Sequence, residues 1–190
     1  DWAKAIAIWR WKLDIQEAAL EPSHPQRVLT SVDLAKAYDA IGEPAKSIPL
    51  WSLLLDVQRE ARGNEDLETL ATMQNLTTAL LALLDDAAAE PLLRELLPVR
   101  TRISPDHWST FFAQASLGGL LARQANFAAA ETLLLTGYEG MQARLPSIPP
   151  AMRQHFTTAL HDLIALYTAW DRPDEAALWQ AKLDQGNATP

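Results

Sequence analysis

An internal repeat of about 42 residues constrains the fold of this 190-residue chain more than any other feature. Trp9 and Trp51 are separated by 42 residues, and each ends a short apolar run. A second series recurs at spacings of 42, 41 and 46 residues, at Leu34, Leu76, Leu117 and Leu163. Two independent series that drift together indicate a tandem array, in which each unit buries its apolar face against the next unit.

Each repeat unit has the pattern of two helices joined by a short break. Apolar residues recur at the spacing of one helical face, as in Leu76, Ala79, Leu80 and Leu83. Breaks that contain proline, such as 42–44 and 171–173, end one helix and begin the next. We therefore predict an all-α chain with helices at residues 2–19, 25–41, 45–62, 66–84, 87–103, 107–124, 127–144, 151–169 and 174–184. They form one domain over residues 1–190, with a leading helix at 2–19 and antiparallel pairs at about 25–62, 66–103, 107–144 and 151–184.

The leucine, small-residue and aromatic positions of each unit resemble the tetratricopeptide (TPR) signature in a longer form of about 42 residues. The resemblance is more specific over 105–183. There, segments 108–111, 118–124, 127–135, 137–141, 166–170 and 172–179 are similar to a C-terminal array found in many bacterial proteins. In those proteins the array commonly follows a serine/threonine protein kinase domain. The resemblance implies a right-handed superhelical solenoid of helix pairs, and a kinase-associated signalling module without catalytic activity of its own.

The composition argues against several other classes of protein. The net charge is −8, whereas a nucleic-acid surface needs clustered lysines and arginines. The chain has no cysteine, so it has no thiolate for metal binding or nucleophilic catalysis. Its longest apolar run, 79–84, is too short to span a bilayer. We therefore expect neither a nucleic-acid partner nor membrane insertion.

The beginning of the chain has helix-like sequence from Asp1 onward, with no initiator Met and no signal peptide. We interpret it as a fragment of a longer protein. That protein would be cytoplasmic, or would place the array outside the cytoplasm if a membrane helix lies upstream. Trp2 and Trp11 lie on a helix that reads as the second half of a repeat whose first helix is missing. Their exposure would follow from truncation, or would mark a packing surface for a preceding domain.

No set of residues supports catalysis, metal binding or a cofactor. A kinase site would need a glycine-rich loop, a catalytic lysine and two acidic motifs, and the sequence contains none of them. Gly118 and Gly119 lie in a helical pattern, so we expect them at a close contact between helices. His155 and His161 are six residues apart and point to different sides of a helix, so they cannot bind one zinc as an i, i+4 pair would. We expect a protein that is not an enzyme.

The function implied by the resemblance is protein–protein interaction. In TPR arrays the first helices of the pairs line a concave groove that holds a peptide. Transferring those groove positions by repeat register gives Lys36, Asp39, Gln74, Thr78, Arg123, His161 and Thr168. The lysine–asparagine clamp of chaperone-binding arrays is absent, so the expected partner is a protein or peptide segment of another kind. Self-association is also compatible with this interpretation. The alternative is a ligand-sensing regulatory domain that binds a small molecule or a peptide in the same groove.

Overall fold

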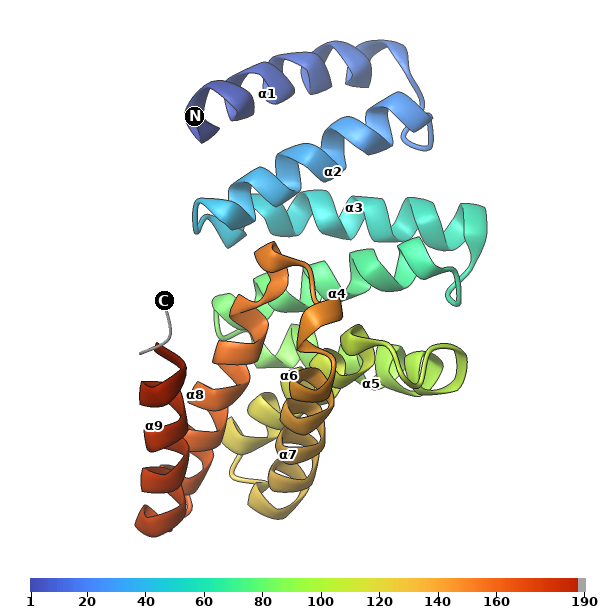
Figure 1. The fold of residues 1–190 in the computed structure, drawn as a ribbon. Helices are drawn as coiled ribbons and strands as arrows, with labels where there is room; N and C mark the ends of the chain where they lie inside the picture. Colours follow the sequence, from blue (N-terminus) through green and yellow to red (C-terminus); the bar gives the residue numbers. More distant parts are fainter. Residues whose placement is uncertain (188–190) are drawn as a thin grey trace. The chain divides into compact units, whose positions relative to one another are not determined.

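The computed structural model describes residues 1–187, and within this range the chain consists of helices joined by short connections, without a β-strand (Figure 1). The α-helices are α1 (Trp2–Ala19), α2 (Pro25–Ala40), α3 (Pro44–Arg62), α4 (Leu67–Ala82), α5 (Asp86–Ile103), α6 (Trp108–Arg123), α7 (Phe127–Ala143), α8 (Gln154–Ala169) and α9 (Pro173–Asn187). Two short 3₁₀ helices, η1 (Leu145–Ser147) and η2 (Pro150–Met152), lie between α7 and α8. The prediction of an all-α fold is confirmed.

The turn within each helix pair has the same backbone geometry in every repeat. One residue per turn has a positive φ, at Gly42, Leu84, Ala125 and Asp171. The next amide donates to a carbonyl five residues back, in the pairs Glu43–Tyr38, Asp85–Leu80, Asn126–Leu121 and Arg172–Tyr167, at 2.9–3.0 Å. This left-handed residue with its backward hydrogen bond ends a helix and satisfies its last carbonyl groups. The recurring turn therefore reverses the chain and places the two helices of a pair side by side.

The connections between pairs begin the next helix with a side-chain cap. His24 and His107 each accept a backbone N–H at Nδ1, from Gln26 and Ser109 respectively, at 3.3 Å. Asp66 does the same for α4 with its carboxylate. The last connection differs, because the proline-rich segment 145–152 contains η1 and η2. α8 consequently begins at Gln154, three residues later than predicted, because η2 occupies Pro150–Met152.

The helices divide into two compact units, residues 1–92 and 93–190. In the N-terminal unit α1 packs against α2, α2 against α3, and α3 against α4. Leu13, Leu34 and Tyr38 form a buried cluster in this unit, and Leu50 of α3 packs against it. Each helix thus buries its apolar stripe against its neighbours in the chain, which is the stacking expected of a helical repeat.

In the C-terminal unit α6 packs against both α7 and α8, and α8 also contacts α7 and α9. The α6–α7 contact depends on glycine. A Cβ atom on Gly118 would lie 2.9 Å from the backbone nitrogen of Leu134, and one on Gly137 would lie 2.7 Å from the carbonyl oxygen of Phe111. There is no room for a side chain at either position. The predicted close helix contact at Gly118 is therefore confirmed.

Candidate peptide-binding surface

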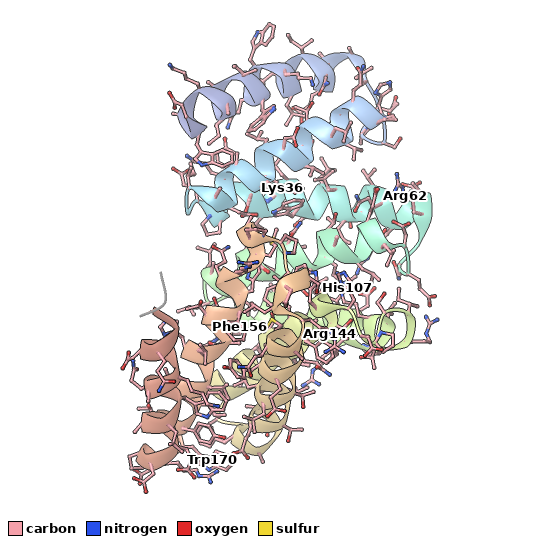
Figure 2. The ribbon with its side chains drawn as sticks, in the orientation of Figure 1. Lys36, Arg62, His107, Arg144, Phe156 and Trp170 are labelled. Atoms are coloured by element: carbon pink, nitrogen blue, oxygen red, sulfur yellow. The ribbon has the colours of Figure 1, made fainter. Side chains whose placement is uncertain are left out.

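Two of the sequence-predicted groove residues, Lys36 (labelled in Figure 2) and Asp39, lie on α2. They have different surroundings. The side chain of Lys36 is exposed to solvent. The Asp39 carboxylate faces α3, where it accepts hydrogen bonds from Ser47 Oγ and, at 2.8 Å, from Trp51 Nε1. Burial raises the pKa of Asp39, and these two hydrogen bonds act against that rise. In this unit Asp39 joins two helices, while Lys36 is exposed to solvent.

The two predicted residues on α4, Gln74 and Thr78, make side-chain hydrogen bonds within their own helix. Gln74 is only 5% exposed, and its Nε2 donates to Thr77 Oγ1 at 3.4 Å. Its Oε1 is buried without a hydrogen-bond partner. Thr78 Oγ1 donates to the backbone carbonyl of Gln74 at 2.8 Å. A buried amide oxygen without a donor is destabilising, and because this oxygen is closed to solvent a ligand does not reach it here.

The remaining predicted residues, Arg123, His161 and Thr168, are exposed on α6 and α8 of the C-terminal unit. Thr168 Oγ1 donates to the carbonyl oxygen of Ile164 at 2.7 Å. Thr158, Ala165 and Thr168 are small, and with His161 they form an exposed row along α8.

A carboxylate that the sequence analysis did not select lies between α6 and α8. A Cβ atom on Gly119 would be 2.6 Å from Oδ2 of Asp162, so this carboxylate occupies the space that a side chain on α6 would fill. Burial raises the pKa of Asp162 to about 6, while the nearby charges of Arg123 and His161 lower it. The structure therefore brings two predicted residues together around one partly desolvated acid. The repeat register maps Gly119 onto Ala165 and not onto Asp162, so the lack of a side chain at Gly119 is the only sequence signal for this contact.

Farther along the same interface the contact becomes aromatic. The ring of His155 on α8 stacks on Phe112 of α6, with ring centroids 4.0 Å apart. Burial lowers the pKa of His155 to about 4, so the ring is neutral at physiological pH. Phe156, labelled in Figure 2, stacks on Tyr138 of α7 at 4.9 Å. This end of α8 is thus anchored by stacked rings, and the polar end near Arg123 faces solvent.

The described part of the chain offers no obvious metal or membrane site. Among residues 1–187, no three or more histidine, aspartate or glutamate side chains gather in a way that could hold a metal ion. No helix in that range combines the length and the apolar character needed to cross a bilayer.

Comparison with known proteins identifies the fold. No known family model matches the sequence, and no curated protein matches it. Among solved structures, a Podosopora anserina protein described as a kinesin light chain with nearly identical TPR-like repeats has a TM-score of 0.71, 22% identity and coverage of 98% of this chain and 87% of its own. A variant of the same protein reaches 0.73 at 22% identity, covering 97% and 85%. BtubC from P. vanneervenii has a TM-score of 0.71 at 18% identity, covering 99% and 74%. The chain therefore has the fold of a TPR-like solenoid of helix pairs.

Proposed function

We propose that this chain is a non-catalytic interaction module that holds an extended segment of another protein along its first helices. The observation that carries the proposal is the exposed face of α8 in the C-terminal unit. There His161 and Thr168 lie on a row of small side chains, with Arg123 on the neighbouring α6. Rigid helices that present such a row offer hydrogen bonds to a bound backbone at little cost in conformational entropy.

The charges of this surface favour an acidic or carbonyl-rich segment. Arg123 supplies a guanidinium with several donors, and His161 adds a donor on the adjacent helix. Asp162 lies between them, and because its pKa is about 6 it is mostly ionised at pH 7 and becomes protonated below pH 6. The net positive charge of this surface therefore grows as pH falls through 6. An acidic ligand would be attracted here even though the whole chain carries a net charge of −8.

The biological context that we propose is the regulatory or substrate-recruiting TPR region of a bacterial serine/threonine protein kinase. This context is supported by the resemblance of residues 105–183 to arrays that follow such kinase domains. In that setting the array would bring substrates or regulators to the kinase. The sequence that precedes the array in its natural polypeptide is the observation that tests this context.

Fluorescence anisotropy with labelled acidic, neutral and basic peptides tests the binding proposal. The acidic peptides are expected to bind most tightly to the full chain. A variant that combines Arg123→Ala with His161→Ala removes two anchors, which should cost about 1–3 kcal/mol and weaken binding by about 5- to 150-fold. Arg102→Ala, an exposed arginine on α5, is the matched control and should leave affinity unchanged.

Circular dichroism should be the same for all three proteins, because the substituted side chains are exposed. The double variant should melt at a slightly lower temperature, because the Asp162 carboxylate loses two attractive charges. The proposal is contradicted if affinity does not depend on peptide charge, or if the double variant binds as tightly as the control.

A further inference from the structure

Asp162 and Asp39 are two acids whose burial is balanced in different ways. Burial raises the pKa of both groups. The Asp39 carboxylate accepts hydrogen bonds from Ser47 and Trp51, and such bonds favour its ionised form. Within residues 1–187, the Asp162 carboxylate accepts no hydrogen bond from another residue. Its ionised form is favoured only by nearby charges and by the solvent that still reaches it.

The position of the Asp162 carboxylate follows from a missing side chain on α6. A Cβ atom on Gly119 would be 2.6 Å from Oδ2 of Asp162 and 3.4 Å from Oδ1, so both oxygens lie against the backbone of α6. α6 and α8 pack together, and Leu163, the next residue on α8, is fully buried. Water is thus excluded from one side of the carboxylate, while Asp162 as a whole stays partly exposed. A proton can reach the group from solvent, and protonation removes the cost of burying its charge.

In the C-terminal unit, the charged groups that act on Asp162 are Arg123 and His161, and both favour its ionised form. Arg123 is the only charged residue of α6, and His161 precedes Asp162 on α8. His155, the other histidine of α8, stays neutral at physiological pH because burial lowers its pKa to about 4. We call Arg123, His161 and Asp162 the α6–α8 surface. The charges of α7 and α9 do not act on Asp162; these helices carry Glu131, Glu139, Asp174, Glu175, Lys182 and Asp184.

The charge of the α6–α8 surface differs between pH 7.5 and pH 5.5. At pH 7.5 the negative charge of Asp162 offsets the positive charge of Arg123. Since the pKa of Asp162 is about 6, most Asp162 side chains are protonated at pH 5.5. Histidine is the other side-chain type that changes charge between pH 5 and 8, so a test has to separate His161 from Asp162. An incoming carboxylate therefore meets a repelling neighbour at pH 7.5 and largely loses it at pH 5.5.

We propose that binding of an acidic segment to the α6–α8 surface is coupled to the uptake of a proton from solvent by Asp162. The inference rests on the proposed function, because it concerns the same surface and the same class of partner. When Asp162 is ionised, it repels the carboxylates of the segment and competes with them for Arg123. When it is protonated, its O–H can donate a hydrogen bond to a carbonyl or carboxylate oxygen of the segment. The chain thus holds an acidic segment more tightly in acid, and Asp162 is the residue that sets this dependence.

Fluorescence anisotropy at pH 7.5 and pH 5.5, at constant ionic strength, measures this coupling. The probe is a labelled peptide whose acidic residues are aspartates, which stay ionised at both pH values. The full chain should bind it about five- to tenfold more tightly at pH 5.5. Asp162→Asn should bind several-fold more tightly than the parent at pH 7.5 and gain less on acidification.

Two further variants separate the contributions. Adding His161→Gln to Asp162→Asn should remove the pH dependence that remains. Glu139→Gln, which removes an exposed acid of α7, is the matched control and should keep the pH profile of the parent.

Carboxyl ¹³C NMR of the labelled full chain gives a second readout that needs no substitution. Coupling between two bound species is reciprocal, so a saturating amount of unlabelled aspartate peptide should raise the pKa of Asp162 above its value in the free chain. An acid with a purely structural role would titrate at the same midpoint with and without the peptide.

The inference is overturned if the parent binds the peptide equally well at both pH values, if Asp162→Asn keeps the pH profile of the parent, or if the NMR midpoint does not rise. Each of these results leaves the proposed function standing, because the peptide still binds. Failure of the peptide to bind at either pH overturns both the inference and the proposed function.

Discussion

Replacing Asp162 with Asn should stabilise the protein near neutral pH, although it removes a charged group next to Arg123. The Asp162 carboxylate is partly desolvated between α6 and α8, and its pKa is raised from 3.8 to about 6. A folded-state pKa above the unfolded value means that ionisation opposes folding. Each pKa unit corresponds to about 1.36 kcal/mol, and with a reduction for partial exposure the cost above pH 6 is roughly 2 kcal/mol. Asparagine has nearly the same shape and fits against Gly119 without that cost.

The direction in which the free energy of unfolding changes with pH depends on whether the folded or the unfolded chain binds more protons. Between about pH 4 and pH 6 the folded chain holds a proton on Asp162 that the unfolded chain has lost, so this group makes stability fall as pH rises. His155 acts in the opposite direction, because its pKa is lowered from 6.5 to about 4. Its stabilising contribution is complete above pH 6.5 and is lost as pH falls toward 4. In the unmodified protein these two effects partly cancel.

Urea unfolding followed by circular dichroism from pH 4 to pH 8 separates the two groups. Asp162→Asn should be more stable than the parent at pH 7.5 and should show a steeper loss of stability on acidification, because only the His155 effect remains. His155→Phe should show the reverse slope. If Asp162→Asn is less stable than the parent at pH 7.5, the attraction to Arg123 outweighs desolvation and the reasoning is refuted.

Three further predictions concern packing, the turns and the absence of chemistry. Gly137→Ala places a methyl group 2.7 Å from the backbone of Phe111, so it should lower the free energy of unfolding by about 1–3 kcal/mol, measured by urea denaturation. Leu84→Gly removes the backbone strain of a leucine at φ 57°, so it should raise the melting temperature and add about 1 kcal/mol to the free energy of unfolding. Gly42→Ala introduces such strain at φ 74°, so it should lower both by similar amounts. An unchanged melting temperature in both turn variants would show that the turns are not strained. Calorimetry with ATP should show no binding to the chain, and micromolar binding would contradict a non-catalytic module.

The helices could be predicted from the sequence because two repeat series indicate the same register. The spacing of Leu34 and its equivalents places apolar residues on one helical face in every unit, and short breaks with proline or acidic residues separate the helices. The start of α8 could not be placed in the same way. The prolines from Pro146 to Pro150 interrupt the pattern, and the choice between a longer loop and η1 with η2 depends on tertiary packing.

The surroundings of the proposed binding residues were predictable only in part. Repeat register placed Arg123 and His161 on first helices, and the α6–α8 contact brings both near Asp162. The burial of Asp162 was not predicted, since an acid on a helix is usually solvated and only the lack of a side chain at Gly119 makes room for it. The same register selected Gln74, yet sequence alone could not show that its amide is buried. The sequence pattern indicates on which face of a helix a residue lies, whereas the solvent exposure of that face depends on the helices that pack against it.

Hydrogen–deuterium exchange with a bound acidic peptide tests the central claim most directly, because it locates the ligand on the full chain without a substitution. If the first helices hold the segment, amides of α8 around His161 and of α6 near Arg123 should exchange more slowly in the complex. Those of α9 should exchange at the rate of the free chain. Protection that is confined to α7, α9 or the connections between pairs, with α6 and α8 unchanged, would contradict the account.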